Sequence, residues 1–220
     1  MLIRTTFTAL VTAAVAAVSL TPFRGSAGDD GDVLTDTIPH NAALIGSLER
    51  DQAGHRDWLG GAEPRIGVVT ARGSHRTSRG LISFDISGIP SDATITGATL
   101  RVDQCATVGT PFASFGAVVV DHLVPSSAPD SATYDAPPAG MNVGTLSTDP
   151  TPGFRSVTVT AGVIADYAAL RALSQFRLRF SAAGAESAAG NDYVAVRTDS
   201  DDDCPGFPDA APALIVTYRR

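Results

Sequence analysis

Residues 78–86 read SRGLISFDI, and this stretch decides the fold class. Ile82, Phe84 and Ile86 recur at every second position, so an extended segment here has one apolar face. A turn-forming run, SGIPSD, follows directly, and the alternation resumes over residues 94–102. The two alternating segments are therefore predicted to be β-strands joined by a turn.

More strand-like segments recur along the chain. They lie at residues 65–70, 115–123, 154–160, 175–180, 192–197 and 213–218. One segment differs, because the apolar side chains of residues 163–173 recur every three or four positions, which predicts a short helix. Residues 124–153 are rich in proline and form a long connection, with short strands expected near 133–134 and 143–146.

The composition agrees with a strand-rich fold. All 16 basic residues are arginine, and only three of the 23 acidic residues are glutamate, so the Glu/Lys stock of solvated helices is missing. We predict an all-β protein, a jelly-roll-like two-sheet antiparallel β-sandwich with one short helix. Residues 28–220 show no linker that would separate two cores, and we expect them to form a single domain.

Residues 1–27 are typical of a signal peptide. Arg4 precedes a short apolar stretch, and small residues at positions 25–27 fit a cleavage site after Ala27. The alternative is a membrane anchor, which needs roughly 20 apolar residues, and this stretch is shorter. We expect a secreted, extracellular protein without a membrane span once the signal is removed.

The expected export bears on the cysteines, and the net charge bears on the binding partners. Cys105 and Cys204 are the only two cysteines, and in an oxidising compartment they are predicted to form one disulfide. The formal net charge of −7 argues against binding to nucleic acid or to anionic lipid.

Three pairs of segments resemble the DNRLRE-type extracellular modules. They lie at residues 81–90 and 93–102, at 157–160 and 176–180, and at 192–196 and 212–218. Members of that family are jelly-roll-like sandwiches on secreted bacterial proteins, related to a carbohydrate-binding module family directed at acidic polysaccharides. The resemblance therefore implies a β-sandwich that binds carbohydrate or serves as an extracellular structural domain. Tyr134 stands where the long connection of the family usually carries tryptophan.

An acidic glycan would be recognised by guanidinium groups, which bind carboxylate and sulfate through paired hydrogen bonds. The candidate ligand-binding arginines are close together in the sequence: Arg56, Arg72, Arg76 and Arg79. Trp58 is the single tryptophan, in a loop-like stretch, and it is the candidate for stacking on a sugar ring. The alternative for Trp58 is a buried anchor of the N-terminal segment.

Motifs of catalysis are missing. The sequence contains neither Gly-x-Ser-x-Gly nor His-Glu-x-x-His, and its four histidines are scattered. His122 follows an apolar strand and is predicted to be packed or hydrogen-bonded rather than catalytic. We predict no catalytic residues, with a small secreted polysaccharide-degrading enzyme on the same fold as the alternative function.

The acidic stretch before Cys204 is a candidate calcium site. Asp199, Asp201 and Asp203 alternate there, and calcium prefers clustered carboxylate oxygens. The residues after the cysteine lack the glycine and glutamate of an EF-hand, so only an irregular site fits. A solvated acidic loop is the alternative.

Overall fold

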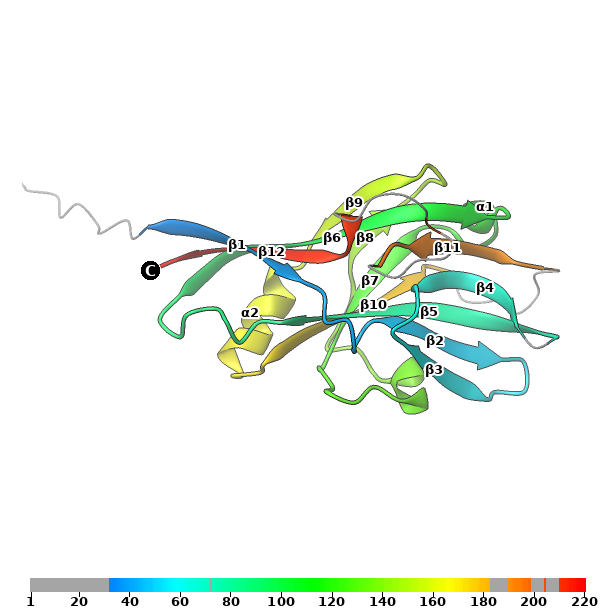
Figure 1. Cartoon of the computed structure of the whole chain (residues 1–220), viewed down its shortest axis with the longest axis horizontal. Coiled ribbons are helices and arrows are strands. Elements are labelled where there is room, and N and C mark those ends of the chain that lie inside the picture. The colour runs from blue at the N-terminus through cyan, green and yellow to red at the C-terminus, as the bar shows by residue number, and fades with distance from the viewer. Residues whose placement is uncertain (1–31, 72, 183–189, 199–203, 205–209) are drawn as a thin grey trace, which may run out of the picture. The chain divides into compact units, whose positions relative to one another are not determined.

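The computed structural model describes residues 32–71, 73–182, 190–198, 204 and 210–220. Its strands in these ranges are β1 (Val33–Pro39), β2 (Gly46–Asp51), β3 (Arg56–Gly60), β4 (Arg65–Ala71), β5 (Ser74–Asp85), β6 (Thr94–Val108), β7 (Val118–Leu123), β8 (Gly140–Ser147), β9 (Gly153–Thr158), β10 (Leu173–Phe180), β11 (Asp192–Val196) and β12 (Ala213–Arg219) (Figure 1). The helical segments are α1 (Pro111–Phe115), the 3₁₀ helix η1 (Ser131–Asp135) and α2 (Thr160–Ala168). The all-β prediction is confirmed.

The strands pair antiparallel in one continuous, curved sheet. The order is β1-β12-β6-β11-β4-β5-β10-β7-β8, with β2 beside β5, β3 beside β2 and β9 beside β6. The two halves of this sheet face each other and enclose the core. Ile82 and Phe84 of β5 pack there in one cluster with Leu100 of β6 and Leu214 of β12. The alternation at residues 82–86 thus gives the buried face of a sandwich, as predicted.

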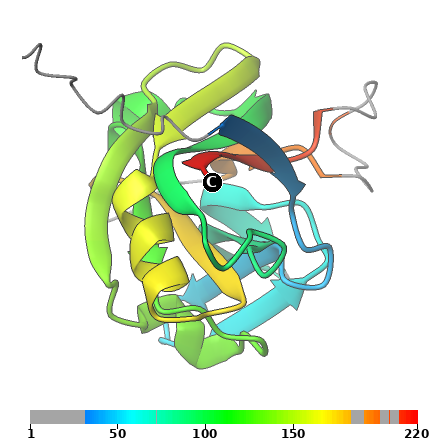
Figure 2. The ribbon, with the colours of Figure 1, turned by 90° about the vertical axis from the view of Figure 1, so that its left-hand side faces the viewer.

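The predicted helix begins and ends earlier than expected. It runs over α2 rather than residues 163–173, and it lies at one end of the sandwich (Figures 1 and 2). Leu170 adopts a left-handed backbone with φ 55° and is 91% exposed, so it ends the helix instead of packing on its apolar face. Leu173 already belongs to β10.

Two further boundaries were predicted wrongly. Phe115 belongs to the short helix α1, which starts at a proline, and the strand that follows begins only at Val118. Tyr134 lies in η1 rather than in a strand, because the Asp130 side chain caps the backbone of Ala132 and Thr133. The strand expected near 143–146 is β8.

The sequence patterns did not reveal the first three strands. β1 is exposed along most of its length and pairs with β12, so its sequence carries no strong apolar alternation. Trp58, predicted to lie in a loop, is the central residue of β3, which pairs with β2. It is half-buried and packs against the cluster of Leu48, Leu81, Leu123 and Tyr134.

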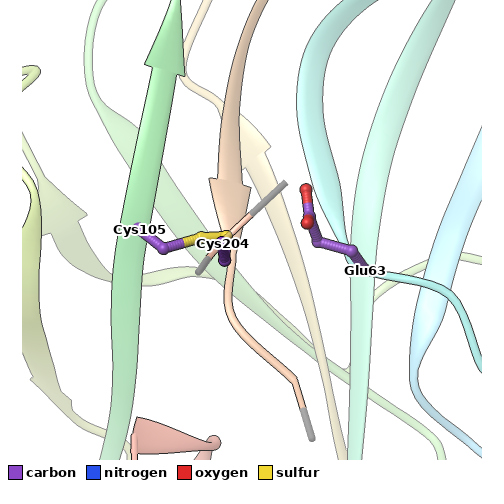
Figure 3. A group of neighbouring side chains, drawn as sticks. All are labelled: Glu63, Cys105 and Cys204. Carbon is purple, nitrogen blue, oxygen red and sulfur yellow. A yellow bond between two sulfur atoms is a disulfide. The ribbon is translucent and has the colours of Figure 1, made fainter. Parts of the chain in front are cut away.

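The disulfide is formed between Cys105 of β6 and Cys204, with a Cα–Cα distance of 5.5 Å. Glu63 lies beside it (Figure 3). The carboxylate of Glu63 and the two sulfurs come within 4.8 Å of one another, but sulfurs joined to each other offer no thiolate for a metal. None of the helices in the described ranges has the length and apolarity that crossing a bilayer requires.

Candidate functional site: an arginine-lined cavity

The outer face of β5, β10 and β7 carries charged side chains. Successive side chains of a strand point to opposite faces, so Arg177 and Arg179 of β10 point outward while Phe176 and Leu178 enter the core. On the neighbouring β5, Arg79 lies on this same outer side. Three guanidinium groups from two adjacent strands are thereby placed on one surface.

These side chains surround a cavity of about 430 Å³. Its lining includes Arg50, Thr77, Arg79, Asp121, Tyr134, Met141, Arg177 and Arg179. The volume falls within the range of about 300–1,000 Å³ that is typical of ligand pockets. Four arginines and one aspartate give the lining an excess of positive charge in a chain whose net charge is −7.

Asp121 organises two of the arginines. Arg179 donates from Nε and Nη2 to the two oxygens of the carboxylate at 2.9 and 3.1 Å, and Arg177 donates from Nη2 at 3.0 Å. The backbone N–H of Asn142 adds a further hydrogen bond at 2.9 Å. Burial disfavours the ionised carboxyl, but the hydrogen bonds from Arg179, Asn142 and Arg177 outweigh it and lower the pKa of Asp121. The carboxylate thus fixes both guanidinium groups.

Tyr134 is one of the residues that line the cavity. Its ring is fully buried, with the guanidinium of Arg79 at 4.1 Å and that of Arg50 at 5.1 Å from the ring centre. Its carbonyl oxygen accepts from Arg79 at 2.7 Å and from Arg177 at 3.0 Å. Burial raises the pKa of Tyr134, and the nearby cations Arg79 and Arg50 oppose this rise. Tyr134 of η1 thus contacts three of the arginines, Arg79 and Arg177 through its carbonyl and Arg79 and Arg50 through its ring.

The hydroxyl of Tyr134 is buried and has at most a weak hydrogen bond, with the side chain of Thr77. Replacing Tyr134 by phenylalanine should therefore leave the free energy of unfolding within about 1 kcal/mol of the wild type, because no more than one weak neutral hydrogen bond is lost. Tyr134→Ala is the control, and it should cost about 3–5 kcal/mol through the lost ring. Urea unfolding measures both values. A loss above 2 kcal/mol, roughly the upper range for a neutral hydrogen bond, in Tyr134→Phe would contradict the assignment.

The structure separates the arginines that the sequence grouped together. Arg79 lines the cavity. Arg76 is buried elsewhere, paired with Asp57 and, at 3.5 Å, with Glu49. Arg56 pairs with Asp135 outside the cavity lining.

None of the remaining predicted site residues is among the residues that line the cavity in the described part of the chain. Trp58 packs on the outer face in the cluster of Leu48, Leu81, Leu123 and Tyr134, and it does not line the cavity. Arg72 and the candidate calcium ligands Asp199, Asp201 and Asp203 lie outside the described residues. The calcium site stays a prediction.

Several cavity residues were missed by sequence reasoning. Arg177 and Arg179 alternate with apolar residues. This alternation was interpreted only as evidence for a strand with one buried face, and the outward-pointing arginines were not considered as a site. Arg50 and Asp121 come from strands whose pairing brings distant segments together, which no local pattern shows. Compared with known proteins, the chain matches no family model and no curated protein.

Proposed function

We propose that this protein is a secreted, non-catalytic β-sandwich module that binds an acidic polysaccharide in the arginine-lined cavity. The observation that carries the proposal is the convergence of four arginines from β2, β5 and β10 on one cavity of an acidic protein. Guanidinium groups bind carboxylates and sulfates in a planar, two-pronged geometry, so they suit the repeating anionic groups of such a polymer.

An apolar residue at the cavity supports a sugar as the ligand. Met141 of β8 lines the cavity and is 69% exposed. Its flexible thioether can pack on the apolar face of a pyranose ring while the arginines hold the charged substituent. The role does not depend on Trp58, which is packed against Tyr134 and its neighbours.

The alternative is a polysaccharide-degrading enzyme on the same fold. Such an enzyme needs an acid or a base within reach of the substrate. The Asp121 carboxylate is saturated by two arginines, and the Tyr134 hydroxyl is buried beneath Arg79. Because the Asp121 carboxylate and the Tyr134 hydroxyl are both occupied or buried, binding is favoured over catalysis at this cavity.

The test compares Arg50→Gln with Arg56→Gln. Both arginines pair with Asp135, and both substitutions remove one positive charge, but only Arg50 lines the cavity. We expect Arg50→Gln to weaken binding of polygalacturonate, alginate or heparin by about tenfold, since a charged hydrogen bond contributes about 1.5–3 kcal/mol. Arg56→Gln should change the affinity less than about twofold, as expected for an exposed charge.

Calorimetric titration measures these affinities, with neutral dextran as the control polymer. Equal losses in the two variants would show attraction to the overall surface charge and would overturn the cavity assignment. Release of unsaturated products or of reducing ends from a retained polymer would replace the module by the enzyme.

A further inference from the structure

A second cavity lies at the first turn of α2. It has a volume of about 380 Å³ and is lined by His122, Val143, Thr158, Val159, Thr160, Ala161, Gly162 and Phe176. Val143, Thr158 and Ala161 are exposed, so this cavity opens to the surface, while Phe176 and His122 are buried at its inner wall. Its walls are mostly apolar, in contrast to the arginine-lined cavity.

His122 is held rigidly at the inner wall. The residue is 3% exposed, and its Nε2 lies 2.8 Å from Oδ2 of Asp166, a fully buried residue of α2. Asp166 also accepts from Ser174 at 2.6 Å and from Arg171 at 2.8 Å. Because an aspartate fixed in this way accepts a hydrogen bond, Nε2 of His122 is the donor. Nδ1 is the other ring nitrogen, and it does not bond to Asp166.

No described residue forms a hydrogen bond with Nδ1 of His122, although the side chain lines the cavity. Gly162 makes room for the ring, because a Cβ at this position would lie 2.9 Å from Cγ and 3.2 Å from Nδ1 of His122. A side chain at residue 162 would therefore displace the imidazole. The glycine allows the first turn of α2 and the histidine to share one cavity wall.

The first turn of α2 supplies further donors. Val159 is the N-cap residue, and no side chain caps the helix. The N–H groups of Thr160 and Ala161 have no partner within the helix, and both residues line the cavity. The helix dipole adds a partial positive charge at this end.

We propose that this cavity binds the carboxylate of a small molecule with a short apolar body. The carboxylate accepts from the free N–H groups of the first turn and, at a pH where an imidazole carries both protons, from Nδ1 of His122. Val143, Val159 and Phe176 enclose the apolar part. The charged groups that contact the imidazole or its partner in the described residues are Asp166 and Arg171.

This site is independent of the arginine-lined cavity. Asp121 and His122 are consecutive in β7, so their side chains point to opposite faces of the strand. Asp121 faces the arginines, and His122 faces α2. A substitution in one cavity should therefore leave the other intact.

The experiment is an NMR titration of the full protein with sodium butyrate, in mildly acidic buffer where an imidazole is protonated. We expect a saturable shift of the His122 ring resonances with butyrate and none with butanol at the same concentration. A shift with butanol that equals the butyrate shift would show that the cavity takes up apolar molecules only, and it would overturn the proposal. The absence of any shift would do the same.

Matched variants locate the binding. Ala161→Trp fills the cavity from its exposed rim, whereas Ala165→Trp places the same ring one turn later on the exposed surface of α2. Butyrate affinity should fall at least tenfold in Ala161→Trp and stay unchanged in Ala165→Trp and Arg50→Gln. A butyrate shift that survives in Ala161→Trp, or one that disappears in Arg50→Gln, would overturn the assignment.

Discussion

Replacing Asp121 by asparagine should lower the free energy of unfolding by about 3–5 kcal/mol, the cost of leaving buried charges without their partner. Arg177 is 4% exposed, and its remaining acceptors, the carbonyl oxygens of Tyr134 and Ala136, carry no formal charge. Arg179 loses a two-pronged contact at the same time. Urea unfolding of the variant and the wild type measures the difference.

The matched control is Asp149→Asn. Asp149 also pairs with an arginine, Arg155, at 3.0 Å, but its side chain is 53% exposed. Water takes over the solvation of an exposed pair, so this variant should unfold almost as the wild type does. Equal losses in Asp121→Asn and Asp149→Asn would contradict the role assigned to the buried cluster.

The loss in Asp121→Asn should depend on pH in one direction. The pKa of Asp121 is lower in the folded protein than in the unfolded chain, so its ionisation favours the folded state above the ordinary pKa of aspartate, about 3.9. This contribution disappears as the pH falls through the folded-state pKa. The difference between the wild type and Asp121→Asn should accordingly shrink below about pH 4. A constant difference across that interval would contradict the pKa direction.

Removing the disulfide should lower the free energy of unfolding by a similar amount. Cys105 and Cys204 are 99 residues apart in the sequence, and cross-linking a loop of this length stabilises the fold by about 4–5 kcal/mol in the chain-entropy model. Cys204 is 3% exposed and packs with Val69 and Tyr193, so alanine substitutions at the two cysteines preserve the apolar surroundings. The midpoint of urea unfolding should fall strongly in the double variant.

Reduction of the wild type provides the control for that variant. The reduced protein should unfold at the same urea concentration as the double alanine variant, because both lack the cross-link. A double variant as stable as the oxidised wild type would contradict the contribution of the disulfide. So would two titratable thiols in the native protein.

The sandwich could be predicted because its central strands carry a strong local signal. Ile82, Phe84 and Ile86 alternate with polar residues, and the same pattern marks β6, β10 and β12. The edge strand β1 has only weak alternation, since its residues are mostly exposed. The short strand β3 consists largely of polar residues and glycine around Trp58, and its order comes from pairing with β2.

The position of the cavity could not be predicted from the sequence. The resemblance to modules directed at acidic polysaccharides made arginines the candidate ligand-binding residues, and one of those chosen, Arg79, lines the cavity. Arg76 was chosen with it because the two are close in sequence, but they lie on opposite faces of β5, where one pairs with Asp57 and the other with Tyr134. Which arginines converge is decided by strand register and by the packing of η1 against β5 and β10, and the residues next to each arginine in the sequence do not show either.

The pairing of β1 with β12 also constrains how this chain folds. The hydroxyls of Thr35 and Thr217 lie 3.3 Å apart although 182 residues separate them. β1 can pair with β12 only after the residues between them have been synthesised. The sheet therefore cannot be completed strand by strand during synthesis. Topologies dominated by such distant contacts fold in milliseconds to seconds rather than microseconds, because the entropy of closing long loops is lost before the contacts form.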